Sequence, residues 1–311
     1  KGTPDARIPG YRTRTSDGGV LPPVTDLDAI PFPDYTDFPW DRYPNRIIPI
    51  MTGRGCGWGK CTFCSDVVTS SGRQFRSRSL GNVIEELKLQ SRRHDSKLFT
   101  FLDLKLNSNL EVWRGLAEQM QSAVPGAEWT ASIHSERDGD DGLSAVDLRN
   151  ARKAGLIRLT TGLESGSQSV LNAMAKGNSP ERLSQTIRYA SEAGISVRLT
   201  CIVGYPGETD EDVRMTRDFL NQHAPYVDRV VLNRFALQFG TPAETLFIKG
   251  NRRMTALDQT EELLDDGLYD FHNATFEPLA HKREMFGVFQ CVHNINRQPL
   301  NQYSKQFEGV M

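Results

Sequence analysis

The sequence has no apolar run approaching the roughly 20 residues that a membrane-spanning helix needs. Its first seven residues, KGTPDAR, also lack the apolar segment of a secretory signal peptide. Neither sign of charge dominates, because 37 basic residues are matched by 39 acidic ones and the formal net charge is -2. We therefore expect a cytoplasmic protein with no membrane partner and no general nucleic-acid surface.

Cysteine is also scarce. The chain has 5 cysteines in 311 residues, and an odd number cannot form a fully paired disulfide framework. Cys56, Cys61 and Cys64 fall within one short segment, which favours metal ligation in a reducing compartment. Cys201 and Cys291 remain apart from that group.

The chain divides into three regions by composition. Residues 1–45 are rich in proline, glycine and aspartate and predict an extended linker. Residues 46–240 alternate short apolar runs with amphipathic segments, which is typical of β-α units around a parallel sheet. Six such units predict an α/β fold, a partial (β/α)6 TIM-like barrel that stays open because eight units normally close one. Residues 241–311 lose the alternation and predict a mostly helical or irregular C-terminal extension that shapes substrate entry.

The expected strands cover 46–52, 97–104, 128–135, 156–164, 196–203 and 229–238. The expected helices between them cover about 80–92, 110–123, 145–154, 180–193 and 211–223. Several of these helices are preceded by Ser, Asn or Asp at the position of the N-cap.

The cysteine group directly follows the first expected strand, at the edge where barrel enzymes assemble their sites. Glycines between Gly53 and Gly59 let the backbone approach a bound group closely. Thiolates suit zinc or an iron–sulfur cluster, and both usually take four ligands. Three thiolates on a [4Fe–4S] cluster would leave one iron open. The alternative is a zinc-stabilised, non-catalytic binding module whose fourth ligand is His134 or Cys291.

The segment from Cys56 to Cys64, with Phe63 before the last cysteine, resembles the signature of the radical S-adenosylmethionine (SAM) superfamily. The first gap differs, because four residues separate Cys56 from Cys61 where the family usually has three. The resemblance implies that the three cysteines bind a [4Fe–4S] cluster and that SAM chelates the open iron. It also implies that Phe63 lies near the adenine, and that reductive cleavage of SAM yields a 5′-deoxyadenosyl radical.

The resemblance extends to the ends of the second and fourth strands. Asp103 resembles the acidic position that holds the methionine amino group of SAM, although Leu102-Asp103-Leu104 replaces the usual Gly-Gly-Glu; the alternative is a loop or cap carboxylate. The segment 162–167, followed by 174–177, resembles the cobalamin-associated subfamilies, in which Glu164 and Ser165 would contact the polar groups of SAM. The alternative for Glu164 is a salt-bridged residue at a strand end.

On the fifth strand, the resemblance implies that Ile202 touches adenine, which turns Thr200 and Arg198 inward and Cys201 toward the helices. Cys201 is then a buried core residue. Arg198 pairs either with the SAM carboxylate or with an internal barrel carboxylate. His134, on the polar face of the third strand, contacts SAM or substrate, or is a structural histidine.

The segment 30–43 looks like the linker that joins a cobalamin-binding domain to the barrel in the cobalamin-dependent branch. No cobalamin-binding domain is present in this sequence, so we expect cobalamin only if such a domain lies upstream. The resemblance implies a methyltransferase-like enzyme that functionalises a C–H bond of a small-molecule or peptide substrate. It also implies a reductant such as flavodoxin or ferredoxin. The alternative within the superfamily is a cobalamin-free epimerase, cyclase or peptide-modifying enzyme.

Overall fold

The computed structural model describes residues 9–10, 18–19, 21, 23–66, 74–249, 257–263, 267–273 and 278–309. Most of the first 22 residues of the expected linker therefore lie outside the described residues. The central element is a six-stranded sheet in the order β1-β4-β5-β6-β7-β8, and each neighbouring pair is parallel. Its strands are β1 (Ile47–Ile50), β4 (Leu98–Phe101), β5 (Glu128–Ile133), β6 (Leu156–Glu164), β7 (Ser196–Val203) and β8 (Arg229–Arg234).

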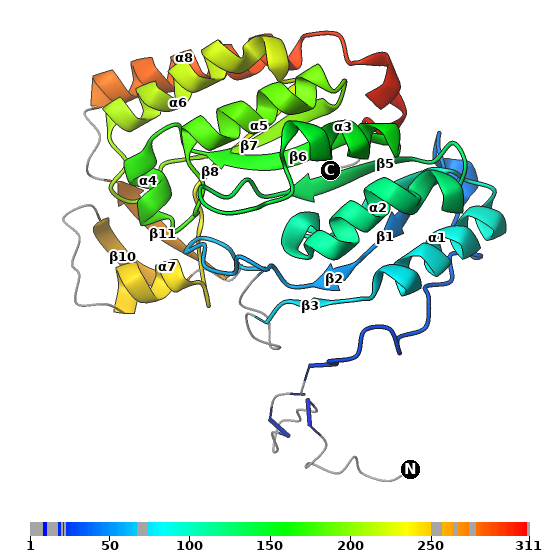
Figure 1. Ribbon diagram of the computed structural model, residues 1–311. Coiled ribbons are helices and arrows are strands. Elements are labelled where there is room, and N and C mark those ends of the chain that lie inside the picture. Colours follow the sequence, from blue (N-terminus) through cyan, green and yellow to red (C-terminus); the bar gives the residue numbers. More distant parts are fainter. Residues whose placement is uncertain are drawn as a thin grey trace.

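Helices connect these strands and cover the outer face of the twisted sheet (Figure 1). They are α1 (Leu80–His94), α2 (Leu110–Ala123), α3 (Ala145–Lys153), α4 (Gln168–Ala173), α5 (Pro180–Glu192) and α6 (Asp210–His223). Two further helices, α7 (Pro242–Glu244) and α8 (Pro278–Asn296), follow the last strand of this sheet. The expected N-caps are present in four of the connecting helices, where a side-chain oxygen accepts a bond from a first-turn backbone N–H: Ser79, Asn109, Ser144 and Ser179. α6 begins one residue earlier than expected, and Thr209 is its N-cap. The expected partial (β/α)6 TIM-like barrel is thus confirmed.

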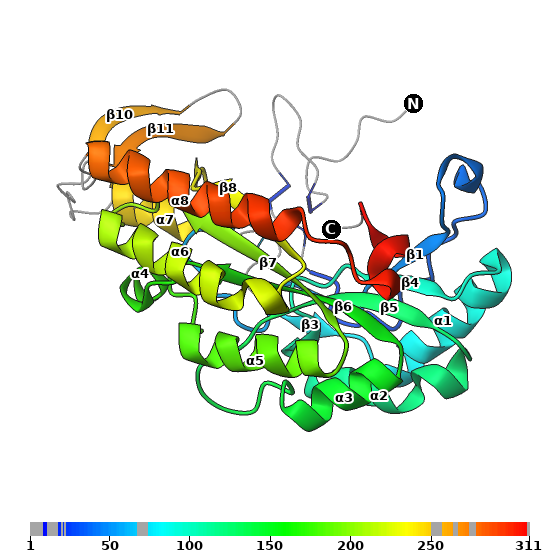
Figure 2. The ribbon, with the colours of Figure 1, turned by 90° about the horizontal axis from the view of Figure 1, so that it is seen from above.

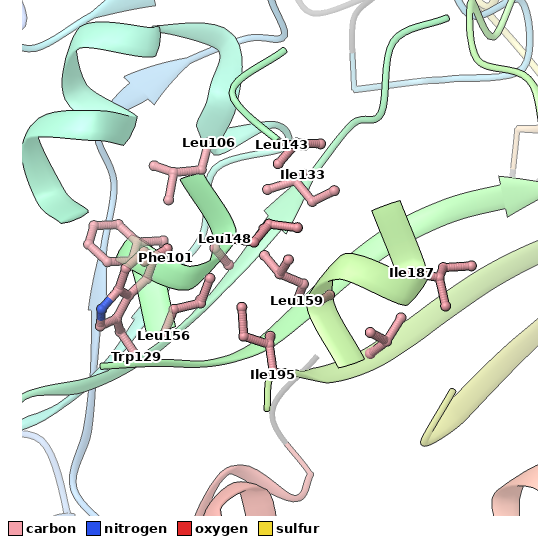
Figure 3. Close-up of a cluster of buried hydrophobic side chains, with 14 of the residues drawn as sticks. Phe101, Leu106, Trp129, Ile133, Leu143, Leu148, Leu156, Leu159, Ile187 and Ile195 are labelled. Atoms are coloured by element: carbon pink, nitrogen blue, oxygen red, sulfur yellow. The ribbon is translucent and has the colours of Figure 1, made fainter. Parts of the chain in front are cut away.

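The main hydrophobic core lies between the sheet and these helices. Figure 3 shows Phe101 and Trp129 from neighbouring strands packed together, with their ring centroids 5.4 Å apart. Leu148 of α3 and Ile187 of α5 belong to the same cluster and are at most 1% exposed. Because the strands are parallel, their carboxyl ends meet at one edge of this rigid layer, and that edge positions the site.

The sixth expected strand, 229–238, is divided in the structure. β8 ends at Arg234, and Leu237–Gln238 forms β9 in a separate sheet with the order β10-β11-β9. β9 pairs antiparallel with β11 (Leu268–Asn273), which in turn pairs with β10 (Leu257–Leu263). The single-strand prediction was wrong because the apolar pattern continues through Phe235 and Leu237 although the hydrogen-bond partner changes. The β10–β11 pair was not predicted.

Two parts of the segment 241–311 pack against the barrel. α8 lies beside α6, and its buried Val288, Cys291 and Ile295 join the main core (Figure 2). The final 3-10 helix, η5 (Gln302–Phe307), lies at the amino-terminal ends of the strands, on the side of the molecule away from α4 and β10–β11 (Figure 1). Phe307 is completely buried there.

Candidate functional site

The three clustered cysteines lie on a loop that follows β1 at the carboxyl edge of the sheet. We call residues Gly53–Cys64 the cysteine loop. It begins with β2 (Gly53–Arg54), which pairs antiparallel with β3 (Arg76–Ser77). The antiparallel pair fixes the start of the loop, while the cysteines themselves lie beyond it.

A second segment, Ala173–Gly177 after α4, holds the cysteine loop in place; we call it the buttress segment. The backbone N–H of Thr62 donates to the Met174 carbonyl at 2.9 Å, and Trp58 Nε1 donates to the Ala175 carbonyl at 2.8 Å. The Tyr205 hydroxyl donates to the Ala173 carbonyl at 3.1 Å and lies 2.8 Å from Thr62 Oγ1. These bonds tie the cysteine loop to the ends of β6 and β7.

Cys56, Cys61 and Cys64 line one cavity of about 240 Å³, and no disulfide joins them. The opposite wall of this cavity comes from the carboxyl ends of β5, β6 and β7 and from the buttress segment. It is lined there by Ser132, His134, Thr160, Glu164, Lys176 and Thr200. The structure therefore brings the cysteines together with polar groups from three strands.

The chemistry of this donor set fits an iron–sulfur cluster. Burial raises the pKa of the Cys61 thiol to about 11 despite the opposing effect of Lys176, so a bound cation is needed to hold it as a thiolate. Within the described residues, no three His, Cys, Asp or Glu side chains are close enough to hold one metal ion. A zinc ion needs its ligands within about 2.3 Å, whereas a cluster takes each thiolate on a different iron. Of the two candidate fourth zinc ligands, His134 lines the same cavity as the cysteines, whereas Cys291 packs against Arg217 and Asn221 of α6.

Glu164 and Lys176 form a buried ion pair inside the cavity. Lys176 Nζ lies 2.7 Å from Glu164 Oε1, with 12% and 6% of the respective side chains exposed. Burial lowers the pKa of Lys176, but Glu164 and Cys61 outweigh that effect and raise it overall, so the ammonium form persists. Glu164 has φ 57°, a left-handed conformation rare for residues other than glycine. Glu164 therefore lines the cavity and, at the same time, forms the salt bridge at the end of β6 that was the alternative prediction.

His134 also faces the cavity, and its ring lies 5.7 Å from that of Trp58 between centroids. One ring nitrogen bonds to the Lys176 backbone, while the buried Nε2 has no hydrogen-bond partner among the described residues. Burial, together with the charges of Lys176 and Lys105, lowers the pKa of His134 to about 2. His134 is therefore neutral and presents an unused acceptor.

Two expected adenine contacts lie next to this site. Phe63 lines the cavity, and Lys176 Nζ lies 5.7 Å from the centroid of its ring. Ile202 is half-buried and packs against a small apolar cluster that also contacts Phe63. The parity prediction for β7 is confirmed, since Cys201 is completely buried in the main core and Thr200 lines the cavity.

Besides Ile202, three expected SAM contacts do not line this cavity: Asp103, Ser165 and Arg198. Asp103 is buried against the start of the cysteine loop, where its carboxylate accepts bonds from the Thr52 backbone N–H at 3.0 Å and hydroxyl at 2.8 Å. Ser165 is also buried, with its hydroxyl 3.3 Å from that of Thr216 on α6. Asp103 thus holds the strand end in the manner of the loop-carboxylate alternative, and Ser165 fixes the turn after β6.

Arg198 lies at the opposite end of the barrel. Its guanidinium is 3.7 Å from Glu308, beside Arg158, which donates to the carbonyls of Phe307 and Ser304 at 2.9 and 3.0 Å. Arg198 is the third residue of β7, and its side chain reaches Glu308 near the start of the strand, whereas Thr200, two residues later on the same face, lines the cavity. The structure thus agrees with the internal ion pair rather than with a contact to the SAM carboxylate.

Sequence reasoning did not single out Lys176, Trp58 or Lys105, all of which line the cavity. Lys105 is buried and pairs with Glu136. A signal for Lys176 was present, since it belongs to the segment 174–177 that supported the resemblance, but its ion pair with Glu164 depends on the turn made by α4.

Among the described residues, no helix is long and apolar enough to cross a membrane.

Comparison with known proteins gives a consistent result. The protein-family model described as the radical SAM superfamily matches residues 50–220. An uncharacterized methyltransferase of Pyrococcus horikoshii is 28% identical over 201 residues, which cover 64% of this chain and 42% of the relative. The anaerobic magnesium-protoporphyrin IX monomethyl ester cyclase of Rubrivivax gelatinosus is 28% identical over 227 residues, which cover 68% of this chain and 40% of the relative.

Among solved structures, the cobalamin-dependent S-adenosylmethionine radical enzyme OxsB is similar in fold. It superposes with a TM-score of 0.72 at 15% sequence identity and covers 91% of this chain and 47% of its own. The chain thus spans less than half the length of each of these three proteins.

Proposed function

Because the chain belongs to the radical SAM superfamily, we propose that it reductively cleaves SAM at a [4Fe–4S] cluster held by Cys56, Cys61 and Cys64. The observation that supports this most strongly is the single cavity in which the three thiols face Glu164, His134 and Phe63. Three thiolates leave one iron coordination site for SAM, and the polar wall offers groups for the rest of that molecule. A reductant such as flavodoxin or ferredoxin would supply the electron.

Cys56, Cys61 and Cys64 would hold the cluster, which would supply the electron needed to break the C5′–S bond of SAM into methionine and a 5′-deoxyadenosyl radical. The residues of the chain hold the reactants. Glu164 accepts hydrogen bonds from the SAM ammonium group or ribose hydroxyls, and His134 Nε2 accepts a further one. Phe63 and Ile202 supply apolar contacts to the adenine. Asp103 and Ser165 contribute indirectly, by fixing the loop and turn that carry these groups.

We further propose that the radical functionalises a C–H bond of an organic or peptide substrate in a methyltransferase-like reaction. A relative named as a methyltransferase and a cobalamin-dependent enzyme of similar fold support this branch. Cobalamin would then be supplied by a separate domain. The segment 241–311 would shape substrate entry, since the Ala243 backbone N–H donates to the Thr62 carbonyl of the cysteine loop at 2.8 Å.

The first experiment tests the cluster. Protein reconstituted without oxygen should contain about four irons and four sulfides per chain, as a [4Fe–4S] cluster requires. A variant with alanine at Cys56, Cys61 and Cys64 should lose both, whereas Cys291→Ala, remote from the cavity, should keep them. Iron retained by the triple variant, or stoichiometric zinc in anaerobically purified parent protein, contradicts the proposal.

The second experiment tests the reaction. Anaerobic turnover with SAM, reductant and candidate substrates should release 5′-deoxyadenosine, and untargeted mass spectrometry should find a product heavier by one methylene group. Reactions with and without added cobalamin separate the two branches. A product of unchanged mass formed without cobalamin would replace the methyltransferase-like reaction with an epimerase or cyclase, and no 5′-deoxyadenosine at all would contradict SAM cleavage itself.

A further inference from the structure

Two buried lysines, Lys105 and Lys176, line the cavity, and the proposed chemistry uses neither ammonium group. Lys176 is on the buttress segment, far from the cysteine loop in sequence, yet its Nζ lies 5.7 Å from the centroid of the Phe63 ring. In the sequence, Phe63 stands between Cys61 and Cys64. Cys61 and Cys64 are both among the groups whose charges act on Lys176. A charge at this position acts on whatever the two thiolates bind.

The position of this charge is fixed from three sides. Lys176 Nζ is held at 2.7 Å by Glu164 Oε1, and the backbone on either side is engaged, with Trp58 donating to Ala175 and Arg137 to Gly177. A side chain at Gly162 would meet the pair directly, because a Cβ there would lie 2.0 Å from Glu164 Oε1 and 2.5 Å from Lys176 Nζ. The ion pair is therefore packed across the end of β6 rather than free to swing into solvent.

A fixed charge in a water-poor site acts strongly on its neighbours, because little solvent screens it. Reduction of an iron–sulfur cluster adds one negative charge. A nearby ammonium group stabilises the reduced state, and a nearby carboxylate destabilises it. The two members of the pair must therefore act on the reduction potential with opposite signs.

We propose that Lys176 is a positioning and tuning residue that raises the reduction potential of the cluster, and that Glu164 limits this effect. The inference rests on the proposed function, because it requires the cluster on Cys56, Cys61 and Cys64. It assigns to the ion pair a role in electron acceptance in addition to the contact between Glu164 and SAM. The easier the cluster is to reduce, the weaker the reductant that can drive SAM cleavage.

The test is a potentiometric titration of the reconstituted full chain without SAM, followed by electron paramagnetic resonance of the reduced cluster. Lys176→Met keeps an unbranched side chain and removes the charge, so its midpoint potential should be more negative than that of the parent. Glu164→Gln should be more positive, and Lys176→Arg should stay close to the parent. Lys105→Met is the matched control, since Lys105 is a buried cavity lysine that pairs with Glu136 instead; its shift should be smaller than that of Lys176→Met.

Lys176→Met leaves Glu164 buried without its cation, and the variant can fail to fold or to hold iron. The double variant Lys176→Met with Glu164→Gln removes both charges, should assemble about four irons, and should return the potential toward that of the parent. Gly162→Ala is an independent variant that displaces the pair without changing any charge, and it should also shift the potential.

The inference is overturned if Lys176→Met and Glu164→Gln both assemble the cluster and shift its potential in the same direction, or leave it unchanged. Unchanged potentials with weaker SAM binding in Lys176→Met would assign the ammonium to the SAM carboxylate instead. These outcomes leave the proposed function intact, provided that the parent assembles its cluster and cleaves SAM. A parent without iron would remove the proposed function and the inference together.

Discussion

The indole Nε1 of Trp58 donates a 2.8 Å hydrogen bond to the carbonyl oxygen of Ala175, 117 residues later in the chain. Two residues further on, Gly177 lies against the face of the same indole: a Cβ at Gly177 would be 2.0 Å from Trp58 Cζ2. Gly177 also has φ 76°, which a residue with a side chain rarely adopts. The cysteine loop thus keeps its path only while this contact stays free of a side chain.

We predict that Gly177→Ala displaces Trp58 and loosens the cysteine loop. Overpacking of this kind costs roughly 1–3 kcal/mol, in addition to the backbone strain. Iron content after reconstitution should fall, and the thermal midpoint should decrease. Gly194→Ala is the matched control, because Gly194 has φ 75° but its nearest potential contact is 3.7 Å away. Equal iron loss in both variants would show that the contact with Trp58 is unimportant.

A second prediction separates two buried charges that sequence reasoning had grouped together. Glu164→Gln should weaken SAM binding by about one to two powers of ten, as loss of a charge-assisted hydrogen bond of roughly 1.5–3 kcal/mol implies. Arg198→Met should leave SAM affinity unchanged, because Arg198 pairs with Glu308 at the other end of the barrel. Titration calorimetry on reconstituted protein measures both. A tenfold loss of affinity in Arg198→Met would contradict the placement.

A third prediction concerns pH. Burial raises the pKa of Glu208 to about 8 from an ordinary 4.5, with a smaller contribution from Asp212 and an opposing bond from the Gly204 N–H. As pH rises, Glu208 ionises at a lower pH in the unfolded chain than in the folded one. Its favourable contribution to stability is therefore complete below pH 4.5 and is lost as pH rises toward 8. Each unit of pKa shift corresponds to about 1.4 kcal/mol.

Glu208→Gln keeps the shape and removes this titration. Urea unfolding should therefore show that the parent loses stability between pH 5 and pH 8, and that Glu208→Gln loses less. Each interval of two pH units should account for about half of the stability that the Glu208 ionisation removes. Parallel stability curves for the two proteins would mean that Glu208 ionises normally in the folded state.

A fourth prediction concerns Cys201, which is completely buried in the main core. Cys201→Ala should lower the free energy of unfolding by about 1 kcal/mol, through the loss of a small packed group. Cys201→Ser should lower it further, because the substitution buries a polar hydroxyl in the apolar core. Both variants should still release 5′-deoxyadenosine and form product. Normal SAM cleavage without product would make Cys201 a hydrogen donor, and would place its thiol on the cavity side of β7.

Local pattern was sufficient for most of the barrel. Apolar runs and N-cap residues such as Ser144 and Ser179 predicted five helices, since a cap and a hydrophobic face depend on near neighbours in sequence. The sixth strand was drawn too long because an apolar run does not reveal its partner, and β9 changes sheets. The β10–β11 pair was also not predicted, although its two strands are neighbours in sequence, and the long-range pairing of β9 with β11 was not predicted either.

The cysteine loop and its place after the first strand were determined by the sequence alone, because spacing is a local property. The inward parity of Thr200 and Ile202 followed from the family resemblance, combined with the alternation of side chains along a strand. Which charges share the cavity was decided only by the tertiary structure. The short turn of α4 brings Lys176 back onto Glu164, while the C-terminal Glu308 draws Arg198 to the far end of β7. Charges pair by distance in space, and that distance exists only after the chain has folded.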